Sequence, residues 1–566
     1  MSKLKALKAA TTLIDFAALL DTPTSTLIHT LYKKPEASKY KTFSIPKKSG
    51  GDRTIHAPIG KLKIYQHELA QLLADCRDEI NAEKPRKPLS HGFRRGLSII
   101  SNAHQHKNRR FVLNLDIADY FPTFNFGRVR GFFIKNGEFE LSPECATIIA
   151  QIACFQGALP QGSPCSPVIA DLITHILDVR LAKLAKQNGA TYSRYADDLT
   201  FSTNAKTFPP GLATGGASPE DPWLLAEQLV SRIAGAGFNI NHDKTRMQAK
   251  ASRQMVTGLT VNEKVNISQS YWRGARTMCH SLFKTGSFYL PSSIIEGEEP
   301  KPIDNRKILR GILGHIYHVK NKSPIKPANK RKDFFFGQKL HEDFWFYDYF
   351  IALDRPLIVP EGPTDTIYLR NAIQRLAVSH PLLGKLSGKE FKYGIGFFSY
   401  ENAANKILRV AGGSDQLKTL VNSYGSRLKK YGHKPLAHPV IILLDNDAGL
   451  SEFSKAIENG YGKIISITTT DDFYHLTDNL YVVKTPEIGV GGQSAIENMF
   501  DNTTLSIPLG GKVLHLNKKT FDETKHIGKV PFAKKVVPAH AGTISWAGFD
   551  PLLKRIEAAI AHYKTL

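Results

Sequence analysis

Two adjacent carboxylates, Asp197 and Asp198, have the setting in this chain that most directly suggests chemistry. They lie within residues 192–201, where β-branched and aromatic side chains flank them, a composition typical of a tight hairpin. Neighbouring side chains on a strand point to opposite faces, so the pair needs a turn before both carboxylates can face one metal site. Taken alone, such a pair is more often part of a solvated loop.

A third carboxylate, Asp116, ends the apolar stretch 111–115. Beside the hairpin it would complete a cluster able to hold two Mg²⁺ ions about 4 Å apart, which suits in-line phosphoryl transfer. Between the two lies the stretch 159–167, whose prolines and glycine prevent regular structure just before an apolar helix. We expect this loop, through Gln161 and Gly162, to contact the base or sugar of a nucleotide.

In this order the three stretches resemble motifs A, B and C of reverse transcriptases. An Asn-Ala-x-x-His element at residues 102–106 and a Val-Thr-Gly element at residues 256–258 narrow the resemblance to the retron class. The resemblance covers most of residues 1–290 and implies an RNA-directed DNA polymerase, a nucleotidyltransferase that uses dNTPs. In that family the two Mg²⁺ ions of the palm are held by the catalytic carboxylates, which here are Asp116, Asp197 and Asp198.

The resemblance also assigns three substrate contacts. Phe121, five residues after Asp116, aligns with the steric gate that selects deoxynucleotides. Lys244 matches the motif D lysine that neutralises or protonates the leaving pyrophosphate. Arg53 lies in the basic, glycine-containing turn 47–53 of a hairpin predicted within residues 40–58, and is expected to contact the incoming triphosphate. The alternatives are an ordinary exposed lysine and an ordinary hairpin tip.

Further residues are predicted to contact RNA. Arg94 and Arg95 are flanked by glycines, so their segment can approach a phosphate backbone closely. The element at residues 102–106 has no Cys or carboxylate at metal-ligand spacing, which argues against zinc. Asn102 and His106 are therefore expected to contact the structured RNA, with buried core polar groups as the alternative. The resemblance adds the residues of the second element, Val256, Thr257 and Gly258.

Composition sets outer limits on these interpretations. The chain has 566 residues, 42% of them hydrophobic, which predicts two to four packed domains. Its net charge is +24, and residues 1–350 carry 49 Lys and Arg against 31 Asp and Glu, so this part is the expected polyanion-binding part. A solvated basic surface is the alternative.

Five cysteines without a Cys-x-x-Cys pair, and no long apolar run, predict a cytoplasmic protein without a membrane anchor.

A second group of acids lies beyond Pro356, where strands and helices alternate and predict a parallel sheet. Glu361 follows the strand 357–360, and Asp445 and Asp447 follow a strand that ends at residue 444. Carboxylates at the C-terminal ends of parallel strands face the usual ligand crevice. A calcium loop is excluded because its twelfth position is not Glu.

Glu361-Gly together with Asp445-x-Asp447 resembles the TOPRIM domain of topoisomerases, primases and nucleases. Glu497, after a glycine-rich stretch, could supply another acid. The resemblance implies a site that binds Mg²⁺ or Mn²⁺ through Glu361, Asp445, Asp447 and Glu497, with Glu361, Asp445 and Asp447 catalytic. A structural α/β domain with incidental acids is the alternative.

The fold class expected from these patterns is a multidomain α+β protein, a right-hand reverse transcriptase followed by a Rossmann-like TOPRIM domain. The expected segments are a helical extension at 1–35, fingers and palm at 36–262, a thumb with a basic linker at 263–345, and a TOPRIM nuclease-like domain at 346–566. The basic run at 320–332 is expected to track a nucleic-acid backbone or to be a solvated connection.

By resemblance, the protein copies a cognate noncoding RNA (msrRNA) into branched, RNA-linked msDNA, starting from the 2′-hydroxyl of an internal guanosine. The TOPRIM half is then a metal-dependent nuclease effector of antiviral defence against phage, held inactive by the bound nucleic acid. A homo-oligomer is compatible with the sequence. Two alternatives remain: a group II intron-like maturase, and a nucleic-acid-binding scaffold whose TOPRIM half is not catalytic.

Overall fold

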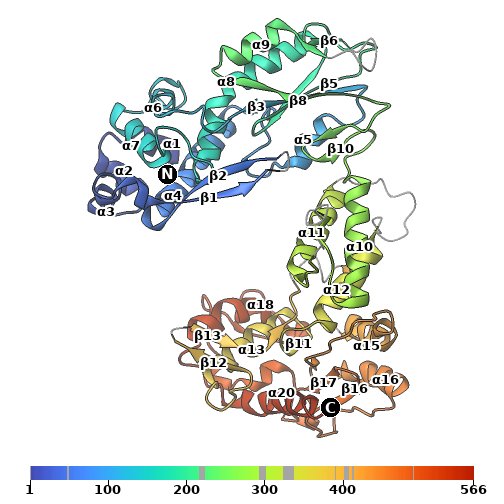
Figure 1. The fold of residues 1–566 in the computed structure, drawn as a ribbon. Coiled ribbons are helices and arrows are strands. Elements are labelled where there is room, and N and C mark those ends of the chain that lie inside the picture. Colours follow the sequence, from blue (N-terminus) through green and yellow to red (C-terminus); the bar gives the residue numbers. More distant parts are fainter. Residues whose placement is uncertain are drawn as a thin grey trace. The chain divides into compact units, whose positions relative to one another are not determined.

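The computed structural model describes most of the chain, namely residues 2–47, 50–215, 223–291, 301–322, 337–388, 390–400, 407, 408, 410, 414–488 and 490–566. Contacts divide it into two compact units (Figure 1), Met1–Tyr271 with Ile316–Lys326, and Trp272–His315 with Pro327–Leu566. Most of the predicted basic linker at 320–332 lies outside the described residues. Among the described helices, none is long and apolar enough to cross a membrane.

The first unit begins with short helices, α1 (Lys3–Ala9), α2 (Leu13–Leu19) and α3 (Thr24–Ile28), in the segment expected to be a helical extension. Thr12 starts α2 as a separate helix, because it caps α2 in a capping box with Asp15. A hairpin follows, β1 (Tyr40–Pro46) and β2 (Asp52–Pro58), as predicted. Two more helices complete this part: α4 (Gly60–Glu83) and α5 (Ile99–Gln105).

An antiparallel sheet of order β4-β5-β3-β8 forms the centre of the first unit. Its strands are β3 (Phe111–Ala118), β4 (Thr191–Tyr195), β5 (Asp198–Thr203) and β8 (Asn239–Ala249). β4 and β5 form the predicted hairpin around residues 196 and 197. The neighbouring helices are α6 (Phe126–Lys135), α7 (Pro143–Ala153), α8 (Ser166–Gln187) and α9 (Glu227–Ala234). Their apolar residues and those of β3 and β5 belong to one core, which fixes the strand ends that carry the acids.

Small strand pairs complete this unit. β6 (Ala213–Thr214) pairs with β7 (Leu224–Leu225), and α9 begins after this strand pair, at Glu227. The backbone groups of Leu224 and Leu225 are engaged in the strand pair and are not available for a helix. β9 (Met255–Val256) and β10 (Leu259–Thr260) form a second hairpin around Thr257 and Gly258.

Three helices lie largely within the segment expected to contain the thumb, α10 (Gln269–Thr285), α11 (Arg306–Lys322) and α12 (Gln338–Phe346). α12 packs within the second unit against α15 (Ser414–Leu428) through aromatic rings, with Phe346 5.4 Å from Tyr424 between ring centroids. The Tyr431 hydroxyl also donates to the Asp343 carbonyl at 2.8 Å. This end of the expected thumb is therefore packed onto the α/β layer.

A five-stranded sheet of order β14-β11-β15-β17-β16 forms the second unit. The strands are β11 (Leu357–Val359), β14 (Gly396–Phe397), β15 (Val440–Leu444), β16 (Tyr474–Thr477) and β17 (Leu480–Lys484). The first four in that order are parallel, as predicted, and β16 is antiparallel. β15 and β17 are buried along their whole length, as expected for central parallel strands.

Helices and small hairpins surround this sheet. The longer helices are α13 (Pro363–Arg375), α16 (Leu450–Tyr461) and α20 (Asp550–Tyr563), and the short ones α17 (Asn502–Leu505), α18 (Lys529–Pro531) and α19 (Val537–His540). The remaining strands are β12 (Gly384–Ser387), β13 (Glu390–Tyr393), β18 (Val513–Leu514) and β19 (His526–Ile527). Because β11 and β15 are parallel neighbours, the residues that follow them lie at the same edge of the sheet.

Candidate functional site

Three carboxylates meet where the strands of the first unit end. In the β3–β5 register Asp116 lies opposite Asp198, and the Ile117 amide donates to the Asp197 carbonyl at 3.0 Å. The turn between β4 and β5 is tight because Ala196 adopts a left-handed conformation with φ of 57°. The structure thus brings together the three acids that the sequence singled out.

The electrostatics of this cluster show how close the acids are. Burial raises the pKa of Asp198 to about 7, with repulsion from Asp197 and Asp116 adding to the effect. Burial also raises the pKa of Asp197, and Asp116 contributes. Lys244, on β8, places its Nζ 3.0 Å from one oxygen of Asp116 and 3.2 Å from the other. Buried acids that repel one another favour a bound cation, so the donor set fits a divalent metal.

In the part of the chain that the structure describes, no three His, Cys, Asp or Glu side chains form a ready-made metal-binding group. The assignment of metal ligands therefore depends on the shared strand edge and on the mutual repulsion of the carboxylates. A cation and a substrate phosphate complete such sites in phosphoryl-transfer enzymes, because Mg²⁺ keeps few protein ligands.

The predicted substrate contacts surround this edge. Arg53 opposes the rise in the pKa of Asp197, which places its charge within reach of the cluster. The loop before α8 contacts the β1–β2 hairpin, which carries Arg53, because the His56 amide donates to the Gln161 carbonyl at 2.8 Å. Gly162, at φ of 110°, leaves no room for a side chain against Ile55. Arg53, Gln161 and Gly162 thus belong to one contiguous region.

Two aromatic residues, Tyr120 and Phe121, follow Asp116 and differ in how far their rings are buried. Tyr120 is buried, and its hydroxyl accepts from Arg194 and bonds Thr174, each at 3.0 Å. Phe121 packs its ring 5.4 Å from Tyr120 and 6.4 Å from Phe93, and is only partly buried. Of the two, Phe121 is therefore the ring that can meet a nucleotide sugar.

The prediction that Asn102 and His106 contact RNA does not fit the structure, because both side chains are fully buried. The His106 ring bonds the hydroxyls of Ser193 and Ser202, each at 2.7 Å, and Asn102 Oδ1 accepts from Ser193 at 2.6 Å. The alternative, buried core polar groups, fits instead. Burial lowers the pKa of His106 to about 3, so the ring is neutral at ordinary pH.

Some of the other residues predicted to contact RNA are also buried, whereas others are accessible. The Arg94 Nε lies 2.9 Å from Asp171, with only 12% of the arginine side chain exposed, and Val256 points into the core. Arg95 remains half exposed while it bonds Asp75 and Asp78. These placements leave Arg95 as the accessible arginine of the pair.

The Val-Thr-Gly element packs on the Asn-Ala-x-x-His helix. The Thr257 hydroxyl donates to the Ile99 carbonyl at 3.2 Å, and Gly258 forms the exposed tip of the hairpin at φ of 81°. The two elements that narrowed the resemblance are thus one structural feature. Thr257 and Gly258 are its more accessible residues.

Two acids that the sequence analysis did not select, Asp171 and Asp178, are fully buried on α8. Together they bind the guanidinium of Arg194, which precedes the Asp197–Asp198 turn. Their spacing of seven residues on an apolar helix face is a signal that could have found them, because residues seven apart lie on one side of a helix.

Four acids gather at the edge of the second unit's sheet. The Asp445 amide donates to Glu361 Oε2 at 3.3 Å, and the Ile496 amide donates to Asp445 Oδ1 at 2.9 Å. Glu497 is fully buried; its Oε2 accepts from Lys529 at 2.9 Å and its Oε1 has no partner among the described residues. Asp447 is exposed and bonds the Gly449 amide.

The pKa values of this group show its mutual repulsion. Burial raises the pKa of Asp445 to about 8, with Asp365, Glu361 and Glu497 adding to the effect. Burial likewise raises the pKa of Asp365 to about 6, helped by Glu497. Asp365 and Lys529 were not among the predicted site residues, although Asp365 lies only four residues after Glu361. The cluster and the unpartnered oxygen of Glu497 fit a cation at this edge.

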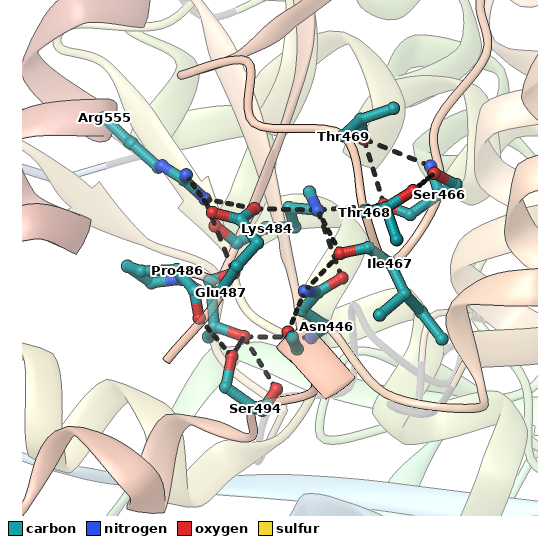
Figure 2. Close-up of polar contacts among 12 residues, drawn as sticks. Asn446, Ser466, Ile467, Thr468, Thr469, Lys484, Pro486, Glu487, Ser494 and Arg555 are labelled. Carbon is teal, nitrogen blue, oxygen red and sulfur yellow. Dashed lines mark hydrogen bonds and ion pairs between the residues drawn. The ribbon is translucent and has the colours of Figure 1, made fainter. Parts of the chain in front are cut away.

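Figure 2 shows the buried network that fixes the loop between Asp445 and Asp447. The Asn446 amide nitrogen Nδ2 donates to the carbonyls of Ile467 and Gly492. Lys484, with no exposed surface, donates to Asn446 Oδ1 at 3.2 Å and pairs with Glu487 at 2.8 Å. These buried hydrogen bonds to Asn446 therefore fix the loop that carries Asp445 and Asp447, two of the predicted site acids.

Substitution of His106 tests its buried placement. Its folded pKa of about 3 lies below the ordinary 6.5, so wild-type stability is complete above pH 6.5 and falls as the pH drops towards 3. By pH 5 this loss is about 2 kcal/mol. His106→Gln cannot titrate, so its stability deficit relative to wild type should shrink by that amount between pH 7.5 and 5, measured by calorimetry of the full chain.

RNA affinity is the companion measurement for this variant. The folded variant should bind RNA as the wild type does, because His106 has no exposed surface. A loss of RNA affinity at an unchanged melting temperature would instead support the direct contact between His106 and RNA that the sequence predicted.

Comparison with known proteins identifies the class of this fold and site. A family model described as "Reverse transcriptase (RNA-dependent DNA polymerase)" matches residues 45–261, which include the three carboxylates of the first unit. The chain is therefore an RNA-directed DNA polymerase.

Individual relatives narrow the identification. The chain is 36% identical to "Retron Mx65 reverse transcriptase" of Myxococcus xanthus over 335 residues, covering 56% of this chain and 70% of that protein. It is 32% identical to "Retron Ec86 reverse transcriptase" of Escherichia coli over 43% of this chain and 70% of that protein. "Retron Mx162 reverse transcriptase" of Myxococcus xanthus is 36% identical, with 48% of its length covered. The chain belongs to the retron reverse transcriptases.

Among solved structures, apo telomerase from Candida tropicalis, truncated from its C-terminal domain, aligns with 43% of this chain and 59% of that one. The sequence identity is 15% and the TM-score 0.28.

Proposed function

We propose that Asp116, Asp197 and Asp198 are the catalytic residues of the polymerase site and hold its Mg²⁺ ions. The observation that carries this proposal is the strand register, which sets Asp116 opposite Asp198 beside the turn that holds Asp197. Bound Mg²⁺ activates the attacking hydroxyl and neutralises charge on the phosphates. The cluster's raised pKa values support the same assignment.

The neighbouring side chains complete the proposed site. Arg53 binds the triphosphate of the incoming dNTP, and the loop at Gln161 and Gly162 positions the nucleotide. Lys244, half exposed and already paired with Asp116, supplies a cation beside the phosphates. Together these residues orient the reactants and stabilise the charge that develops on the transferred phosphate.

The proposed template is a cognate noncoding RNA (msrRNA), and the proposed product is branched, RNA-linked msDNA primed from a guanosine 2′-hydroxyl. Support comes from the three relatives reported above, each of which is named a retron reverse transcriptase. The +24 net charge is consistent with tight binding of these polyanions. A group II intron-like maturase is the alternative, and the formation of branched, RNA-linked DNA would distinguish the two.

Asp197→Asn should lower cDNA synthesis by about a thousandfold without unfolding the chain, because it removes a metal ligand but keeps the side-chain shape. The measurement is msDNA yield after expression with the cognate RNA. Asp119→Asn is the control, since Asp119 is exposed and lies three residues after Asp116. Normal msDNA from the Asp197 variant would show that the hairpin acids are not the metal ligands.

Phe121→Ala should weaken the preference for dNTPs over rNTPs by about tenfold to a hundredfold, because a ring that abuts the ribose 2′ position would be lost. The measurement is kcat/KM for a matched dNTP and rNTP pair. An unchanged sugar preference, with normal dNTP incorporation, would place the gate at another residue.

For the second unit, we propose a metal-dependent nuclease of TOPRIM type that acts as an effector against phage and is restrained by bound msDNA. Support comes from the acids Glu361, Asp445 and Glu497, which share the C-terminal edge of a parallel sheet, with Asp447 beside them. Burial, together with repulsion from the neighbouring acids, raises the pKa of Asp445 to about 8, so a Mg²⁺ or Mn²⁺ ion would stabilise the cluster. A scaffold role without catalysis is the alternative.

Glu361→Gln and Asp445→Asn should each reduce nuclease activity by about a hundredfold or more, while msDNA synthesis stays normal, because the two sites lie in different units. Cleavage of labelled RNA and DNA by the purified complex, after its bound DNA is digested, is the measurement. Glu458→Gln is a control in the same unit, on an exposed position of α16. Loss of msDNA as well would indicate that the second unit supports the polymerase structurally.

A further inference from the structure

The turn that carries Asp197 and Asp198 needs something to hold it. Ala196, at its centre, has φ of 57°, a left-handed conformation that a residue with a Cβ rarely adopts. Such backbone conformations persist where the surroundings enforce them. The groups that touch the turn from inside the first unit are therefore of interest.

Arg194, two residues before Ala196, is fully buried and has each guanidinium nitrogen engaged. Its Nη1 donates to the Ala196 carbonyl and to the Tyr120 hydroxyl, both at 3.0 Å. Its Nε and Nη2 form a two-pronged pair with Asp178 at 2.7 and 2.8 Å, and Nη2 also reaches Asp171 at 2.8 Å. The planar fork of arginine can make all of these bonds at once, whereas a lysine ammonium cannot.

Asp171 connects this arginine to the segment 89–94. It accepts from Ser90 at 2.5 Å and pairs with Arg94 at 2.9 Å and with Arg77 at 3.1 Å. Burial alone would raise the pKa of Asp171, but Arg194, Arg94 and Arg77 lower it to about 2. The carboxylate is therefore charged and is shared between the segment and the hairpin.

The same segment runs against the hairpin backbone. The His91 amide donates to the Arg194 carbonyl at 2.8 Å, and the Arg194 amide donates to the Leu89 carbonyl at 2.9 Å. A Cβ on Gly92 would lie 2.7 Å from the Ala196 amide nitrogen, so only glycine allows this approach. The turn is thus held by Arg194 on one side and by Gly92 on another.

A general structural role does not account for this arrangement well. Buried ion pairs often contribute little net stability compared with apolar residues of similar size. One bond of the network goes to the carbonyl of Ala196, and Gly92 packs closely against the amide of the same residue, next to the two carboxylates proposed as metal ligands. Groups that orient metal ligands in this way are usual around metal sites.

We propose that Arg194, fixed by Asp171 and Asp178, and Gly92 are positioning residues that hold the Asp197–Asp198 turn in its metal-binding geometry. This inference rests on the proposed polymerase site. It assigns no contact with substrate to Arg194, which acts through the backbone of Ala196.

The test is the Mg²⁺ concentration for half-maximal cDNA synthesis by the full chain on its RNA. Arg194→Lys keeps the charge but loses the fork, and it should raise this concentration by about tenfold or more, with activity partly restored at high Mg²⁺. Tyr192→Phe is the matched control. It removes one hydrogen bond from the same Asp178 without touching the turn, and should stay within about twofold of wild type.

Gly92→Ala tests the other side of the turn without removing a charge, and decides the question if Arg194→Lys does not fold. It should also raise the Mg²⁺ requirement by about tenfold, whereas Gly131→Ala, which has open space around it, should not. Melting temperatures and RNA affinity are recorded for each variant.

A wild-type Mg²⁺ requirement in folded Arg194→Lys, or an equal rise in Tyr192→Phe, would overturn the inference. This failure is distinct from failure of the proposed site. If Asp197→Asn is inactive and Arg194→Lys has normal Mg²⁺ dependence, the metal ligands stand and only the positioning role falls.

Discussion

Repulsion between buried carboxylates is the constraint on which the rest of this structure depends. In each unit the fold brings acids together at the end of a sheet, Asp116 with Asp198 in the first and Glu361 with Asp445 in the second. Water is partly excluded from both places, so the charged forms are costly and the pKa values of Asp198 and Asp445 rise. A bound cation lowers this cost, and each site already has one lysine that partly balances the negative charge of its acids, Lys244 beside Asp116 and Lys529 beside Glu497.

Each acidic loop also depends on a buried cation that does not face the site. Arg194 bonds the carbonyl of Ala196 within the Asp197–Asp198 turn, and Lys484 bonds Asn446 within the Asp445–Asp447 loop (Figure 2). In both cases the buried charge is itself compensated by a buried or half-buried acid, and one of its hydrogen bonds goes to the loop. Loops are otherwise the more mobile parts of a protein, so such anchoring is what allows precise geometry there.

The sequence predicted those parts that depend on local patterns. Alternation and turn composition located the hairpin at Asp197, and strand-then-acid spacing located Glu361 and Asp445 on a parallel sheet. Burial of polar side chains depends on tertiary packing, and there the sequence failed: His106 was expected at the RNA and lies between two serines in the core. Arg94 was expected at a phosphate and is engaged largely with Asp171, because three arginines converge on one buried acid from distant segments.

Lys244 shows how a sequence-based role and an observed contact can both hold. The motif D resemblance assigns it to the leaving pyrophosphate, whereas its Nζ lies 3.0 Å from Asp116. A lysine has a long flexible stem and a charge that any oxygen anion attracts, and about half of this side chain is exposed. The ammonium therefore needs little rearrangement to exchange a carboxylate for a phosphate once metal ions neutralise Asp116. Its contact with Asp116 offsets the negative charge of the cluster and keeps the ammonium beside the acids that we propose as the polymerase site.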